Sequence, residues 1–276
     1  MVASLRSPNL SKIQGVTRLR SRFLTLLVAI VLSLAALPFL LPGGTAAAAQ
    51  TADAAPVATP AVADAAEPTA ETSGIQVAAE AAGVSRSVLN IALNAVQCAV
   101  NSGDIPAPPT LTVIDYSRPS TEPRLWVFDF HTGALLFREL VAHGKGTGDN
   151  LAEHFSDEMN SHQSSLGLFV TKDTYVGHNG YSLRLDGLEP GFNSRAMARA
   201  VVMHGAPYVN AEFATKQGRL GRSWGCPALR EAVAHQVIDT VRGGGVIFSY
   251  YPDQKWLTES RFLNCGARAK HVLATN

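Results

Sequence analysis

The sequence predicts a mainly β fold with helical decoration, a sandwich or barrel rather than a parallel sheet. Short runs of strand-forming residues follow one another after Leu111, a helical pattern precedes them, and regular helices do not separate them. The charged fraction of 16% is below the roughly 25% of an average soluble domain. With a net charge of +1 and no clustered basic face, nothing indicates a nucleic-acid partner.

The first predicted element of the folded part is a helix over residues 85–101. Apolar residues recur there at helical spacing, Ser85 or Ser87 can cap its start, and Gly103 lies just past its end. A second helix is predicted over residues 228–241, ended by three consecutive glycines. The predicted strands cover residues 111–114, 124–130, 135–141, 168–171, 182–185, 201–204 and 246–251, with a hairpin turn at His131-Thr132-Gly133.

The N-terminal part has the layout of a segment for export. Basic residues are followed by an uncharged apolar run over 23–41 and then by small residues, which is typical of a secretory signal peptide cleaved after Ala49. The apolar run is also long enough for a retained membrane anchor. We therefore expect an exported protein of the periplasm or cell envelope. Residues 50–73, rich in Ala, Pro and Thr, predict a disordered linker to a domain over 74–265, with a tail over 266–276.

Cys226 lies in the segment Ser223-Trp224-Gly225-Cys226-Pro227, a setting typical of a catalytic thiol. Gly225 lets the backbone approach a substrate closely. The predicted helix over 228–241 would place Cys226 just before a helix N-terminus, where the dipole and free N–H groups lower a thiol pKa and hold an oxyanion. A buried structural cysteine is the alternative interpretation.

A thiol nucleophile needs a base. His204 follows an apolar run and precedes Gly205, which is a usual place for a catalytic side chain, although a satisfied structural histidine is the alternative. A His-Gly pair followed about twenty residues later by Ser-x-Gly-Cys resembles the murein L,D-transpeptidase catalytic domain family (YkuD-like fold), in a divergent Ser-x-Gly-Cys-Pro-Ala subgroup. The resemblance covers residues 85–257 and includes the segments Asp115-Tyr116-Ser117, His143-Gly144-Lys145-Gly146, Ser164-Ser165-Leu166-Gly167 and Leu185-Asp186-Gly187.

The resemblance implies a YkuD-like β-sandwich or barrel preceded by a helix, and an acyl transfer that needs no metal or organic cofactor. Cys226 would attack the diaminopimelate carbonyl of a peptidoglycan tetrapeptide stem and release D-Ala. The thioester would pass to an amine of another stem, giving a cross-link, or to water, giving carboxypeptidase activity. His204 would move the proton, the N–H groups of Gly225 and Cys226 would hold the oxyanion, and Ser223 would orient His204 or line the oxyanion hole. The expected partners are stem peptides, with a monomeric protein attached to the membrane only through its N-terminal segment.

The sequence departs from the family pattern inside the motif. Trp224 stands where many members have His, and Pro227-Ala228 stands where many have an apolar residue and then Arg or Asn. The arginine expected to meet a substrate carboxylate is therefore absent there. Arg222 and Arg184 are candidate replacements, each with a plain surface charge as the alternative. His143 is either a second active-site residue or part of a structural loop, and Ser165 either lines the substrate cleft or starts a strand.

Three cysteines are an odd number for an exported chain. We hypothesise that Cys98 and Cys265 form a disulfide that clamps the two ends of the domain, with two buried free thiols as the alternative.

Three rival functions remain open at this level. A zinc hydrolase with His143, His204 and Cys226 as ligands would lack the usual close-spaced ligand pair, so no metal is expected. A cysteine-dependent peptidoglycan peptidase is the closest neighbour in chemistry, but such enzymes commonly place Cys before His. A catalytically inactive wall-binding module is the third.

Overall fold

The computed structural model describes residues 70–265, which all belong to one compact unit. The helices are α1 (Ala70–Ala81), α2 (Arg86–Asn101), α3 (Ala211–Gln217), α4 (Glu231–Val241) and α5 (Gln254–Glu259). The strands are β1 (Thr110–Asp115), β2 (Leu125–Asp129), β3 (Leu135–Glu139), β4 (Val141–Ala142), β5 (Gly167–Gly177), β6 (Gly180–Gly187), β7 (Val202–Ala206), β8 (Ala228–Arg230) and β9 (Val246–Tyr250). The expected signal segment over 1–49, residues 50–69 of the expected linker and the tail lie outside the described residues.

The nine strands form one sheet in the order β3-β2-β1-β9-β5-β6-β7-β8-β4. Its two end strands, β3 and β4, are neighbours in the chain with only Leu140 between them, so the sheet curls until its ends almost meet. An ion pair of 2.7 Å between Arg230 and Glu139 joins the end of β8 to the end of β3. The expected mainly β fold with helical decoration, a nearly closed barrel, is confirmed.

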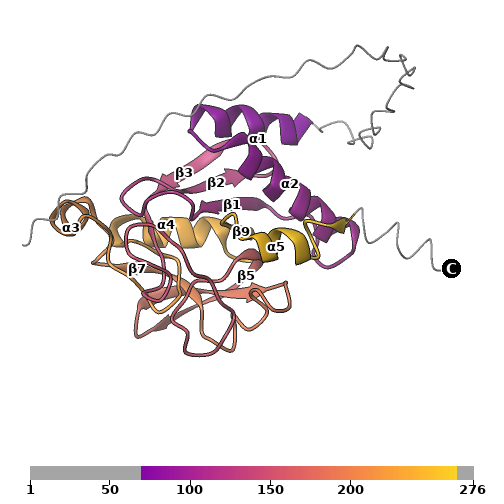
Figure 1. The fold of residues 1–276 in the computed structure, drawn as a ribbon. Coiled ribbons are helices and arrows are strands. Elements are labelled where there is room, and N and C mark those ends of the chain that lie inside the picture. Colours follow the sequence, from indigo (N-terminus) through magenta and orange to yellow (C-terminus); the bar gives the residue numbers. More distant parts are fainter. Residues whose placement is uncertain (1–69, 266–276) are drawn as a thin grey trace, which may run out of the picture. The chain divides into compact units, whose positions relative to one another are not determined.

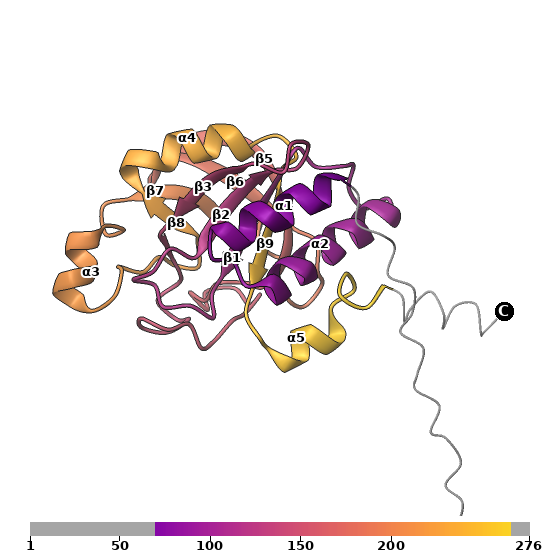
Figure 2. The same cartoon turned by 90° about the horizontal axis from the view of Figure 1, so that it is seen from above.

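Both faces of the sheet are buried, and different helices cover them. Trp126 and Phe128 of β2 face a core shared with α1 and α2, whereas Leu125 and Val127 face a second core shared with α4. This alternation follows the two-residue period of a strand. Figures 1 and 2 show α1 and α2 side by side over β1, β2 and β3, with α4 set apart from them.

The two short helices were not predicted from the sequence, but local side chains define their starts. Asn210 accepts a hydrogen bond of 2.7 Å from the Phe213 N–H at the start of α3, and Gly218 ends that helix at φ 68°. Asp253 caps α5 in the same way through the Trp256 N–H, at 2.7 Å. Since a capping side chain satisfies a free N–H, a helix of one or two turns can form there.

Two sequence predictions about helices need correction. Helix α1 begins at Ala70, inside the segment expected to be a disordered linker, and buries Ile75 fully. The helix expected over 228–241 begins only at Glu231, because Ala228–Arg230 form β8 between β7 and β4. Cys226 therefore precedes a strand and does not lie at a helix N-terminus, so the expected helix dipole does not act on its thiol.

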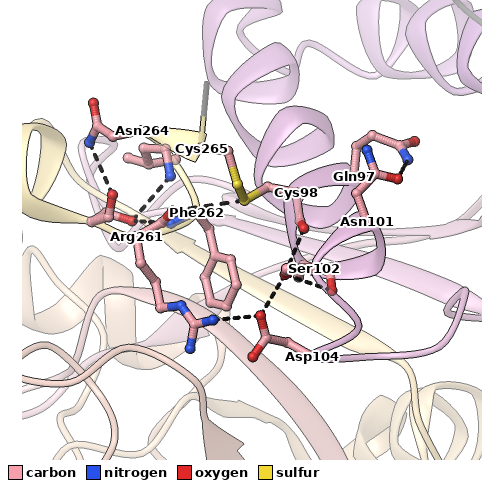
Figure 3. Close-up of a disulfide and its surroundings, with 12 residues drawn as sticks. Gln97, Cys98, Asn101, Ser102, Asp104, Arg261, Phe262, Asn264 and Cys265 are labelled. Atoms are coloured by element: carbon pink, nitrogen blue, oxygen red, sulfur yellow. Dashed lines mark hydrogen bonds and ion pairs between the residues drawn. A yellow bond between two sulfur atoms is a disulfide. The ribbon is translucent and has the colours of Figure 1, made fainter. Parts of the chain in front are cut away.

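The structure joins Cys98 and Cys265 in a disulfide, with the Cα atoms 6.1 Å apart (Figure 3). The bond links the last turn of α2 to the segment after α5. An ion pair of 2.6 Å between Arg261 and Asp104 joins the same two parts of the chain. Cys226 is left as the free thiol among residues 70–265.

Candidate active site

The pairing of β7 with β8 brings the turn that carries Cys226, just before β8, alongside β7, which carries His204. His204 pairs with Ala228 in a parallel register, so Cys226, two residues earlier, lies beside Val202. The Val202 N–H donates to the Cys226 sulfur at 3.5 Å. Since side chains alternate between faces, His204 lies on the face of β7 opposite Met203, which belongs to the core under α4. The Cys226 thiol also donates to the Ala200 carbonyl oxygen at 3.8 Å, and His204 lies two residues after Val202 along the same strand.

The His204 ring is buried and held by its own backbone. Its Nδ1 lies 2.8 Å from the Gly205 carbonyl oxygen, which places a proton on Nδ1 and leaves Nε2 as the basic nitrogen. Burial lowers the pKa of His204, and the Gly205 carbonyl opposes that change only in part. A neutral imidazole with a free Nε2 can accept a proton from a thiol.

Ser223 holds the turn around Cys226. Its Oγ donates to the Cys226 carbonyl oxygen at 2.7 Å and accepts from the Gly225 N–H at 3.1 Å. The expected role of Ser223 in orienting His204 is therefore wrong in this geometry, because the Gly205 carbonyl does that. The Gly225 N–H is also engaged, so it does not point at an oxyanion as expected.

Gly225 is required by the shape of the turn. Its φ is 120°, a region that glycine adopts readily, and a Cβ at this position would lie 2.8 Å from the Gln163 carbonyl oxygen. Ser164 also holds this turn in place. Its Oγ donates to the Gly225 carbonyl oxygen at 3.1 Å and accepts a hydrogen bond from the Gly144 N–H at 3.1 Å. Three separate segments of the chain thus meet at the Cys226 turn.

Burial raises the pKa of the Cys226 thiol. The Val202 N–H, the positive charge of Arg199 and the Cys226 N–H oppose that rise. The buried thiol and the buried imidazole are therefore both shifted toward their neutral forms.

Arg199 is a buried cation at the site that the sequence analysis missed. Its guanidinium lies 3.4 Å from where a Cβ on Gly225 would stand, and it pairs with buried Asp157 at 3.9 Å. It also donates to Ser156 O at 2.7 Å, Ser165 Oγ at 2.5 Å, Ser161 Oγ at 3.2 Å and Gln163 O at 2.6 Å. Arg199 therefore fixes residues 156–165 beneath the turn. No sequence signal marked it, because its partners are far away along the chain.

His143 and Ser165, both expected to contact substrate, are buried parts of the scaffold. The His143 Nδ1 lies 2.9 Å from Nη2 of fully buried Arg124, and its Nε2 lies 3.3 Å from the Gly148 carbonyl. Burial and the Arg124 charge lower the pKa of His143 to about 4. The Ser165 Oγ donates to the Ser156 carbonyl at 2.8 Å. Neither side chain is open to a ligand in this geometry.

The two candidate replacements for the missing motif arginine are also engaged. Arg222 donates to the Gly148 carbonyl at 2.9 Å and pairs with Asp149 at 2.8 Å. The Arg184 guanidinium lies 4.2 Å above the Tyr175 ring. Trp224, in contrast, is 70% exposed on the Cys226 turn.

Within residues 70–265, no group of three His, Cys, Asp or Glu side chains is arranged to hold a metal ion. The rival zinc hydrolase would use His143 as a ligand, but both ring nitrogens of His143 are engaged, with Arg124 and with the Gly148 carbonyl.

Comparison with known families decides what this site belongs to. Residues 80–250, more than half of the chain, match the model of the L,D-transpeptidase catalytic domain. The chain belongs to the L,D-transpeptidase catalytic domain family. This membership confirms the family expected from the sequence. The matched segment contains both His204 and Cys226.

Several solved L,D-transpeptidase structures are similar to this chain. One from Mycobacterium smegmatis shares 16% identity over 52% of this chain and 59% of its own, with a TM-score of 0.34. One from Mycobacterium tuberculosis shares 13% over 52% and 58%, with a TM-score of 0.34. One from Xylanimonas cellulosilytica shares 14% over 64% and 78%, with a TM-score of 0.30. The chain thus spans less than two thirds of the two mycobacterial proteins, and the family assignment rests on the domain match. No curated protein matches the chain.

Proposed function

We propose that this L,D-transpeptidase-family protein transfers an acyl group from a peptidoglycan tetrapeptide stem through a thioester on Cys226. The observation that carries the proposal is the arrangement of β7 and β8, which sets the Cys226 turn beside a His204 whose Nδ1 is held by the Gly205 carbonyl. This leaves Nε2 as the base on the strand next to the nucleophile.

In the proposed mechanism, His204 Nε2 takes the thiol proton as the Cys226 sulfur attacks the carbonyl before the terminal D-amino acid. The carbon–nitrogen bond breaks, and the imidazolium returns the proton to the leaving amine. A thioester and a free D-amino acid result. An amine of a second stem then attacks the thioester, giving a cross-link, or water attacks it, giving a shortened stem. Either way the thiol is regenerated.

We propose that the Cys226 N–H, rather than the Gly225 N–H, stabilises the oxyanion. The Gly225 N–H is occupied by Ser223, whereas the Cys226 N–H lies close enough to its own sulfur to affect the thiol pKa. An N–H held in place by the turn needs no reorganisation as charge develops. Ser223 contributes by fixing the turn from both sides.

The expectations for the rest of the chain remain proposals. We propose that residues 1–49 direct export and are either cleaved or kept as an anchor, that residues 50–69 tether the domain, and that the protein acts as a monomer in the periplasm or cell envelope. Among residues 70–265, no helix combines the length and apolar character that crossing a bilayer requires.

The test is an incubation of the purified protein with a disaccharide tetrapeptide, with products identified by mass spectrometry. A cross-linked dimer that has lost one D-Ala indicates transpeptidation, and a tripeptide alone indicates carboxypeptidation. Cys226→Ala should abolish both products. Equal product formation by the Cys226→Ala protein would contradict the cysteine mechanism, and no product from either protein would favour an inactive wall-binding module.

A further inference from the structure

An exposed cluster of aromatic and basic side chains stands on the nucleophile-bearing turn. The rings of Trp224 and His162 stack with centroids 4.9 Å apart at an angle of 26°. The Lys145 Nζ lies over the Trp224 ring, 5.2 Å from its centroid. These three residues are called the Trp224 cluster below.

The backbone is shaped to present this cluster. His162 and Asn160 have φ values of 53° and 60°, in a region that non-glycine residues rarely adopt. The Lys145 N–H donates to the Ser223 carbonyl at 2.8 Å, which ties the lysine backbone to the residue before Trp224. The other two tryptophans, Trp126 and Trp256, are fully buried, whereas Trp224 is 70% exposed. A large aromatic ring held in solvent by rigid backbone indicates a binding surface.

Lys145 differs from the other cations around the turn in having open donors. The Arg199 guanidinium is engaged in hydrogen bonds with residues of the loop 156–165, and Arg222 is held by Asp149 and the Gly148 carbonyl. Lys145 is exposed, and among residues 70–265 no carboxylate pairs with it. Its contact with the Trp224 ring holds the ammonium near the turn while leaving its N–H groups free for an anion.

We propose that the Trp224 cluster is a binding subsite for a carboxylate group of the peptide substrate, with Lys145 as the residue that recognises the charge. This inference rests on the proposed function and names a residue that takes the place of the missing motif arginine. Two groups of a stem peptide have this chemistry: the terminal α-carboxylate and the side-chain carboxylate of its diamino acid. The Trp224 and His162 rings would pack against the apolar part of the same peptide.

The inference can be tested by binding alone, using the otherwise intact Cys226→Ala protein. Trp224 is the exposed tryptophan, so ligand binding at the cluster should change its fluorescence, and Trp224→Phe should remove that change. The probes are three synthetic tetrapeptides: one with only the terminal carboxylate free, one with only the side-chain carboxylate free, and one with both amidated.

In the Cys226→Ala background, Lys145→Met should weaken binding of one mono-carboxylate peptide about fivefold and leave the doubly amidated peptide unchanged, because only the former loses a charge-assisted contact. The peptide that responds identifies the carboxylate. The matched control is Lys172→Met, since Lys172 pairs with Asp186 at 3.1 Å on β5 and β6. Its affinities should equal those of the parent.

The proposal is overturned if Lys145→Met changes binding of the amidated and free-carboxylate peptides equally, or changes neither. Because the assay uses a protein without the nucleophile, its result does not depend on thioester formation. If the proposed acyl transfer through Cys226 is wrong, the activity assay would instead show product formation that Cys226→Ala does not abolish.

Discussion

Burial shifts the pKa values of the Cys226 thiol and the His204 imidazole in opposite directions. The thiol pKa is raised and the imidazole pKa is lowered, so both groups are neutral near pH 7. This differs from a preformed thiolate–imidazolium pair. In the proposed acyl transfer the proton would therefore move from Cys226 to His204 during the attack, with His204 as the general base.

This proton transfer predicts a specific pH dependence. Since burial lowers the pKa of His204 below its ordinary value of 6.5, kcat/KM should fall as the imidazole becomes protonated, with a midpoint below pH 6.5. No fall is expected between pH 7 and 8, because deprotonating the thiol only helps attack. Initial rates of D-Ala release across this range provide the measurement. A midpoint above pH 6.5 would contradict a neutral resting pair.

The residue types of the site were recognisable from the sequence, but their contacts were not. Cys226, His204 and Trp224 stand out because each lies beside glycine in a local motif. The burial of His143 depends on Arg124, and the charge near the thiol depends on Arg199. Both partners come from other parts of the chain, so no local pattern could reveal them.

Among the helices and strands, the start of α4 shows most clearly what a local sequence pattern cannot predict. The sequence predicted a helix from residue 228, but α4 begins at Glu231. Residues 228–241 continue one helical pattern, yet the first three pair with β7 and β4 instead. A three-residue strand is decided by its neighbours in the sheet and not by its own propensity. Helix α1 was missed for a related reason, since it contains few bulky residues and packs beside the β2–β3 hairpin, close to Gly133.

Arg199 couples the loop over residues 156–165 to the Cys226 turn, so its removal should affect both stability and the thiol. Arg199→Met would remove the cation 3.9 Å from buried Asp157, which keeps its hydrogen bonds from the Arg195 N–H and the Ser194 hydroxyl. It would also remove the donors to the Ser156 and Gln163 carbonyls, at a cost of about 1–3 kcal/mol in the free energy of unfolding. It should also raise the thiol pKa, since the Arg199 charge lowers it. Arg199→Lys should keep more of the charge effect than of the loop contacts. Thermal unfolding and the pH dependence of Cys226 alkylation measure the two effects.

A merely structural role for Arg199 would give a different pattern. Arg199→Met would then lower the melting temperature while leaving the pH midpoint of alkylation unchanged. Lys216→Met offers a matched control, because Lys216 forms an exposed pair with Glu212 on α3.

In the molecule as a whole, the Cys98–Cys265 disulfide links α2 to the segment after α5. It links residues 167 positions apart, and cross-links of long loops stabilise proteins by roughly 2–5 kcal/mol. In the denatured, non-reduced protein, one thiol per chain should therefore be alkylated, at Cys226. Reduction should expose three thiols and lower the melting temperature.

The paired variants Cys98→Ser and Cys265→Ser serve as the control for this prediction. Each should lower the melting temperature as reduction does, and the double variant should lower it no further. Alkylation of Cys98 and Cys265 without a reductant would contradict the disulfide. The fold class itself followed from the sequence because short runs of strand-forming residues, such as those of β2 and β9, are a local property.

The most direct test of the central claim is the intact mass of the protein after brief reaction with a tetrapeptide donor and an acid quench. We expect a mass increase equal to the donor stem without its terminal D-Ala, mapped by peptide sequencing to Cys226 and absent from Cys226→Ala and from His204→Ala. An acyl group found on another residue, or the same adduct on the Cys226→Ala protein, would contradict a thioester on Cys226.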